Sequence, residues 1–86
     1  MTFSLVARCA ETGMFGVAIS SSSPAVAARC AFTHAGVGAV ASQNITDPSL
    51  GPFALDLMQG GATAAQAIAR IKTDSAFIDY RQVLVI

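Results

Sequence analysis

Strand-like patterning fills the first half of the sequence, and helical patterning fills most of the second half. Large apolar residues alternate with polar or small ones through residues 2–9 and again through residues 14–20, which is the period of a β-strand. Glu11–Gly13 lies between them and supplies a turn with a glycine suited to positive φ. We therefore predict an antiparallel hairpin spanning Thr2–Ser20. Residues 37–43 predict a further strand, built largely from small side chains.

Helical signals begin at Pro52, which the first turn of a helix tolerates, and the two glycines at 60–61 end that element. Thr63, followed three residues later by Gln66, predicts a capping box at the start of a second helix. Residues 25–32 fit a helix and a strand equally well. Because strands come first and helices follow, the pattern predicts an α+β fold with the helices layered on an antiparallel sheet.

The sequence is unusually apolar for its length. Eighty-six residues make one domain at most, yet 53% are hydrophobic and only 12% are charged, against roughly 25% charged in a typical soluble domain. A small domain has the most surface per residue, so this shortage of charge predicts a large face covered by other protein. The net charge of zero excludes a basic footprint for nucleic acid or for an anionic membrane, and we expect neither as a partner.

The last residues point to such a covered face. A free edge strand is normally blunted by charge, proline or shortness, whereas a strand buried on both faces is apolar throughout. We expect the final run to be paired and covered by protein beyond residue 86 or by another chain, and we expect an oligomer. The run consists of four consecutive apolar β-formers, Val83, Leu84, Val85 and Ile86.

Several classes of site find no support. No apolar stretch reaches the roughly 18 residues of a membrane span, and no basic signal-peptide start is present, so the cytosol is the expected compartment. Cys9 and Cys30 form neither a disulfide framework nor a metal motif. His34 is the single histidine and has no partner at ligand spacing, so we expect no metal. Gly36–Gly38 runs into a strand and is not a dinucleotide fingerprint, so we expect no cofactor.

The strongest candidate for a nucleophile lies at the start of the sequence. If Met1 is removed, Thr2 becomes N-terminal and carries a hydroxyl and a free α-amine on one residue. An α-amine ordinarily has a pKa of about 7.7–8.0, so its neutral form can take the hydroxyl proton and activate threonine as a nucleophile. Many chains begin Met-Thr, so an ordinary terminal threonine is the competing interpretation. Ser20–Ser23 form a hydroxyl-rich run that fits either an anion site or a solvated turn.

Three stretches of the sequence resemble one known family. They are residues 1–8 with 11–13 and 16–18, then residues 35–43 with 47–52, then residues 55–61 with 81–83. The family is domain-of-unknown-function family 1028, a bacterial family of predicted N-terminal-nucleophile (Ntn) hydrolases. The resemblance implies the αββα sandwich of Ntn hydrolases and, by analogy within that superfamily, hydrolysis of a C–N amide bond. Family members are longer, so residues 1–86 are expected to form one incomplete αββα domain, completed by further sequence or another chain.

The resemblance implies that Thr2 is the nucleophile and that a small-molecule amide is the substrate. Gln43 and Asn44 follow a neighbouring predicted strand, and their side-chain amides are candidate donors to the oxyanion. The alternative is that both residues serve the turn that precedes Asp47-Pro48. The end of the second predicted strand would bind the substrate through Ser20, Ser21 and Ser22.

Two features depart from the family pattern. Cys9 stands where an acidic residue is usual, and we expect it to be a small buried thiol. Met1 precedes Thr2, so the nucleophile role depends on removal of Met1. A non-catalytic structural or binding subunit on the same fold is the alternative function, favoured by the shortage of charge and the apolar terminus. A chain that wholly retains Met1 favours this second interpretation.

Overall fold

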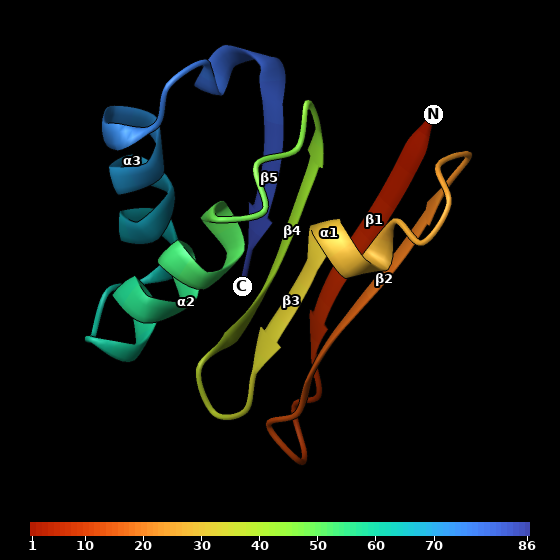
Figure 1. Ribbon diagram of the computed structural model, residues 1–86. Coiled ribbons are helices and arrows are strands. Elements are labelled where there is room, and N and C mark those ends of the chain that lie inside the picture. The colour runs from red at the N-terminus through yellow and green to blue at the C-terminus, as the bar shows by residue number, and fades with distance from the viewer.

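A three-stranded antiparallel sheet lies at the centre of the computed structural model, which describes residues 1–86 (Figure 1). A two-stranded hairpin packs on one face of this sheet, and two helices cover the other face. The elements follow the chain as β1 (Thr2–Arg8), β2 (Phe15–Ser21), α1 (Ala27–Cys30), β3 (Ala31–His34), β4 (Gly38–Asn44), α2 (Leu50–Gln59), α3 (Ala64–Asp74), the short 3-10 helix η1 (Ile78–Tyr80) and β5 (Arg81–Val85).

Strands β1 and β2 form the predicted hairpin, with Thr2 opposite Ser21 and Arg8 opposite Phe15. Gly13 turns the chain at φ 74°, a left-handed conformation that favours glycine because it has no Cβ. Because side chains alternate between the faces of a strand, every second residue points toward the central sheet. The half-buried apolar residues on that inner face are Val6, Phe15, Val17 and Ile19.

The outer face of the hairpin is apolar and uncovered. Phe3 is 67% exposed and Leu5 is 62% exposed, and the β2 residues on this face, Gly16 and Ala18, are small. The structure therefore confirms the predicted α+β class. It has three layers, which are the helices, the central sheet and the hairpin. A fourth, helical layer on the hairpin stays a prediction.

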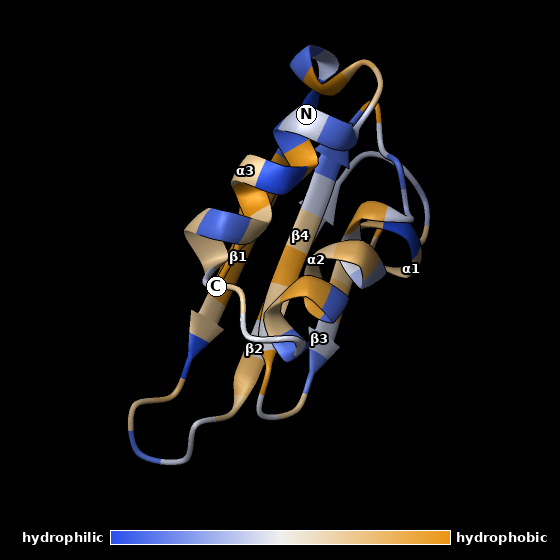
Figure 2. Ribbon diagram, turned by 90° about the vertical axis from the view of Figure 1, so that its left-hand side faces the viewer, coloured by the Kyte–Doolittle hydropathy of each residue, from blue (hydrophilic) through white to orange (hydrophobic).

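The core lies between strand β4 and helices α2 and α3. β4 is buried on both faces from Gly38 to Ser42, and Figure 2 shows hydrophobic colour along its middle, behind the two helices. The predicted capping box at Thr63 and Gln66 begins α3, so that helix presents Ala67 and Ile71 to the core. The buried apolar cluster contains Val40, Leu50, Ala54, Leu55, Ala67 and Ile71.

The structure resolves two segments that the sequence left open, residues 25–32 and the terminal run at residues 83–86. Residues 25–32 divide between the single turn of α1 and the start of β3. β5 pairs antiparallel with β4, so one edge of the terminal run is paired within the chain. Val83 and Val85 pack against the core, whereas Leu84 is 45% exposed on the opposite face. Cover for that face by other protein stays a prediction.

Close packing around Gly51 predicts a sensitive position. Gly51 is buried in the first turn of α2, and an alanine Cβ there would lie 2.2 Å from Cδ2 of the Phe32 ring. Alanine favours a helix by up to about 1 kcal/mol over glycine, but overpacking costs about 1–3 kcal/mol. We therefore expect Gly51→Ala to lower the free energy of unfolding by about 1–2 kcal/mol in urea titrations.

The matched control is Gly16→Ala on the exposed face of the hairpin. A Cβ at Gly16 meets no atom within 4 Å, so this substitution should leave stability unchanged or slightly raise it. Equal stability of Gly51→Ala and the parent chain would contradict the tight contact between α2 and the Phe32 ring.

Candidate active site

Thr2 lies where the start of β1 meets the ends of β2 and β4. Its Oγ1 shares a hydrogen bond of 2.9 Å with Oγ of Ser21, which is the residue opposite it in the hairpin. Its carbonyl oxygen accepts a hydrogen bond of 3.3 Å from Nε2 of Gln43, at the end of β4. The fold therefore brings together three of the predicted site residues that are 19 and 41 positions apart in the sequence.

The Gln43 side chain on β4 links this strand to β1 and β5 through hydrogen bonds. Its Nε2 donates to the Thr2 carbonyl and, at 2.8 Å, to Oε1 of Gln82 on β5. An amide nitrogen carries two hydrogens, so both are used, and neither is free for an oxyanion. The Gln43 Oε1 is buried and has no hydrogen-bond partner. In this arrangement Gln43 positions Thr2, and a donor role would require one of its two bonds to break.

Asn44 is the remaining predicted donor, and its backbone is unusual. Its φ is 72°, in the left-handed region that non-glycine residues adopt rarely and that asparagine tolerates best. Its side-chain amide makes no hydrogen bond within the chain, so both N–H groups are free. Asn44 lines an open pocket of about 400 Å³ together with Met1, Thr2, Gln43 and Gln82.

The three predicted substrate serines separate in space. Ser21 faces Thr2, and its Oγ also accepts the backbone N–H of Ser23 at 3.2 Å. Ser20 points to the outer face of the hairpin, opposite Phe3, because neighbouring strand residues face opposite sides. Ser22 is exposed beyond the end of β2. The geometry thus places Ser21, and not Ser20, beside the Thr2 hydroxyl.

No charged side chain lines the space around Thr2. A second open pocket shares Thr2, Gln43 and Gln82 with the first, and it continues over Ser4 and Leu84 toward β5. Its lining is made only of hydroxyl, amide and apolar groups. Gln82 was missed in the sequence, although the alternation of residues 82–86 indicates that Gln82 and Leu84 share one face of the strand.

Met1 occupies the position before Thr2 and is exposed. The α-amine of the 86-residue chain therefore belongs to Met1, and the Thr2 nitrogen is part of a peptide bond. Removal of Met1 would place an α-amine on Thr2, next to the hydroxyl that Ser21 contacts. The open pocket at Met1 leaves that end of β1 accessible.

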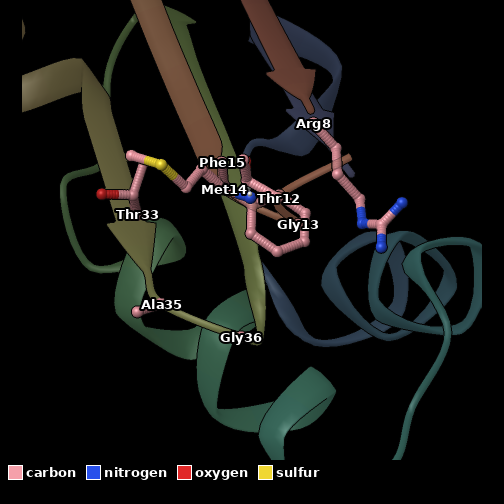
Figure 3. A pocket seen from close by; sticks show the side chains of 8 residues that line it. All are labelled: Arg8, Thr12, Gly13, Met14, Phe15, Thr33, Ala35 and Gly36. Carbon is pink, nitrogen blue, oxygen red and sulfur yellow. Dashed lines mark hydrogen bonds between the residues drawn. The ribbon is translucent and has the colours of Figure 1, made fainter. Parts of the chain in front are cut away.

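A different pocket of about 490 Å³ lies at the opposite end of the hairpin, between the β1–β2 turn and the β3–β4 turn (Figure 3). In that view the Phe15 ring lies in the middle, with Arg8 extending to one side and Met14 and Thr33 on the other. This pocket holds none of the predicted site residues. His34 lies at the end of β3, next to this turn, and is remote from Thr2 in the fold.

The expectation that Cys9 is buried is wrong. Cys9 is exposed at the β1–β2 turn, whereas Cys30 is buried with its Sγ 3.5 Å from Oγ1 of Thr46. The strand ends at Arg8, so the turn carries Cys9 away from the core. Hydrogen bonds from the side chain and backbone of Thr12, and from the Glu11 backbone, hold the pKa of the Cys9 thiol below its usual value.

Alkylation should separate the two thiols. A thiol reacts through its thiolate, so we expect iodoacetamide at neutral pH to modify Cys9 of the folded chain and to leave Cys30 unmodified. Peptide mass mapping measures the two sites. In urea both residues should react, and Cys9→Ser should leave the folded chain unlabelled. Equal labelling of the two thiols in the folded chain would contradict the burial of Cys30.

Comparison with known proteins gives one match. Residues 2–86 match the model of a family described as a family of unknown function (DUF1028). No curated protein and no solved structure matches the chain. No helix has the length and apolar character that crossing a membrane requires, and no group of three or more histidine, cysteine or acidic side chains is placed to hold a metal ion.

Proposed function

Because the chain belongs to the DUF1028 family, whose function is unknown, we propose a function from its own site: hydrolysis of a small-molecule amide by Thr2. The observation that carries this proposal is the convergence at Thr2. Its hydroxyl contacts Ser21, its carbonyl is held by Gln43, and Asn44 is among the residues that line the same pocket. A hydroxyl positioned by a second hydroxyl suits attack on a carbonyl, and the Asn44 amide is the proposed donor to the oxyanion.

The proposed reaction needs Met1 to be removed. The Thr2 Oγ1 attacks the amide carbon, and the α-amine of Thr2 takes the hydroxyl proton. That proton passes to the leaving nitrogen as the C–N bond breaks, so an acyl ester remains on Thr2. A water molecule then attacks the ester, gives one proton to the α-amine, and releases a carboxylic acid while Thr2 regains its hydroxyl proton.

Two neighbouring residues have separate roles in this proposal. The side-chain N–H groups of Asn44 donate to the oxyanion that forms on the carbonyl oxygen. Gln43 is a positioning residue, because its bonds to the Thr2 carbonyl and to Gln82 fix the start of β1. The side chains that line both pockets are uncharged, which favours a neutral substrate.

The proposed domain is an αββα sandwich of the Ntn-hydrolase type. Three of its layers correspond to helices α2 and α3, the central sheet, and the hairpin. A fourth helical layer would cover Phe3 and Leu5, and further sequence or another chain would supply it. Burying each of these side chains stabilises the protein by about 1.5–3 kcal/mol.

Blocking the α-amine tests the proposed activity. The chain that begins at Thr2 is assayed against a panel of small neutral amides by measuring the released ammonia or amine. We expect release by this form and none by a form that retains Met1. Acetylating the amine of the Thr2-first chain keeps the hydroxyl and removes the base, so it should stop the reaction. Equal release by the Met1-containing form would contradict the proposed mechanism.

A non-catalytic structural or binding subunit is the second candidate function. The uncovered apolar face at Phe3 and Leu5 favours it, because monomeric proteins rarely expose contiguous apolar patches. The two candidate functions predict different N-terminal residues for the purified protein. Complete retention of Met1 in the purified protein favours the binding subunit, and a chain that begins at Thr2 favours the hydrolase.

A further inference from the structure

An open cavity with apolar and charged lining lies on the helix side of β5, on the opposite face of that strand from the Thr2 site. Its volume is about 310 Å³, at the lower end of the range for small-molecule sites. Alternation along β5 places the two sites on opposite faces, because Gln82 bonds to Gln43 beside Thr2 while Val83 packs against the core. Val83 borders both pockets. The apolar lining comes from α3, η1 and β5, through Ile68, Ile71, Ile78 and Val83.

The charged groups at this cavity are not paired with one another. Lys72, Asp79 and Arg81 all line it, yet none of them forms an ion pair. The one ion pair of the structure joins Arg70 to Asp74 on the exposed side of α3. Two cations and one carboxylate line the cavity, and the Asp47 carboxylate outside it also interacts with Arg81. The lining itself favours an anionic ligand.

Arg81 also has an unmet hydrogen-bond requirement. One of its terminal nitrogens donates to the carbonyl of Ala76, but its Nε is buried and has no partner. A buried donor on a charged group is costly when it is left unsatisfied. A carboxylate matches the planar geometry of guanidinium and can pair with the outer N–H groups of Arg81.

We propose that this cavity binds a small amphipathic monocarboxylate. The carboxylate contacts Arg81 and Lys72, and the hydrocarbon part lies on the isoleucines of α3 and η1. The site is separate from Thr2 and does not depend on the hydrolase function. The small volume restricts the ligand to a short chain, so hexanoate is a suitable probe.

Binding is tested by titrating the full 86-residue chain with hexanoate and following the backbone amide signals by NMR. We expect saturable shifts centred on Ile68, Ile78 and Val83. Hexanol has the same chain without the charge and should bind about 10-fold more weakly, because hydrogen bonds to charged groups are worth about 1.5–3 kcal/mol. Equal affinity for hexanoate and hexanol, or shifts centred on Phe3 and Leu5, would overturn the proposal, and so would the absence of saturable shifts.

Variants separate the charge from the cavity itself. Arg81→Gln should weaken hexanoate binding at least about 10-fold. Because Arg81 also contacts Ala76, a second variant, Ile68→Phe, fills the cavity without changing its charge and should also abolish binding. Arg70→Gln on the same helix is the matched control, since Arg70 pairs with Asp74 and does not line the cavity. Unchanged hexanoate affinity in folded Ile68→Phe would overturn the proposal.

Discussion

Replacing Thr2 with alanine is expected to lower amide hydrolysis by about 10⁴-fold or more, because the substitution removes the attacking oxygen. Thr2→Ser keeps a hydroxyl next to the α-amine and should retain activity, although it loses the methyl group that helps to fix the side chain. Alanine and serine are both small, so removal of Met1 should proceed in both variants. The measurement is kcat/KM for the best amide of the panel, together with the intact mass of each variant.

The controls for this prediction lie next to Thr2. Ser21→Ala leaves the nucleophile in place and removes only its hydrogen-bond partner, so it should reduce the rate less than Thr2→Ala does. Ser20→Ala on the outer face should leave the rate unchanged, since Ser20 points away from Thr2. Activity of Thr2→Ala equal to that of the parent chain would exclude Thr2 as the nucleophile.

Replacing Ile71 with alanine is expected to lower the free energy of unfolding by about 2–5 kcal/mol. Ile71 is 1% exposed and packs in the cluster that joins α3 to β4. Truncation leaves a cavity there in addition to the lost burial of apolar surface. Since a small domain is stable by about 5–15 kcal/mol, a loss of this size is readily measured by urea unfolding.

Ile45→Ala makes the same chemical change at a surface position. Ile45 is 60% exposed, so its truncation should change stability by no more than about 0.5 kcal/mol. Similar losses of stability in the two variants would show that α3 does not pack on the sheet as described.

Local sequence patterns were sufficient for the hairpin and for the two long helices. The alternation in residues 2–20 and the turn at Gly13 are contained within one hairpin, and the capping box of Thr63 and Gln66 spans four residues. Such signals depend only on neighbours in the sequence, so they can be recognised without knowledge of tertiary contacts. The short segment α1 carried no such pattern, because four residues are too few to show a helical period.

The geometry of the site depended on long-range contacts that no local pattern reports. Thr2, Gln43 and Asn44 could be proposed from local sequence alone. That Gln43 uses both of its N–H groups on Thr2 and Gln82 could not. That arrangement requires β4 to pair with β5 and the hairpin to pack on the same sheet. The serine run was also beyond local reasoning, because the register of β2 decides that Ser21 alone faces Thr2.

Reaction with a β-lactone is the measurement that tests the Thr2 nucleophile most directly. A β-lactone acylates an activated hydroxyl, and intact mass reports how many acyl groups each chain carries. Because the exposed Cys9 thiol can also be acylated, every chain in this test carries Cys9→Ser. We expect one acyl group per chain, mapped to Thr2, on chains that begin at Thr2. Chains that retain Met1 and the Thr2→Ala variant should remain unmodified. Chains that begin at Thr2 but gain no acyl group, or gain it at another residue, would contradict the assignment of Thr2 as the nucleophile.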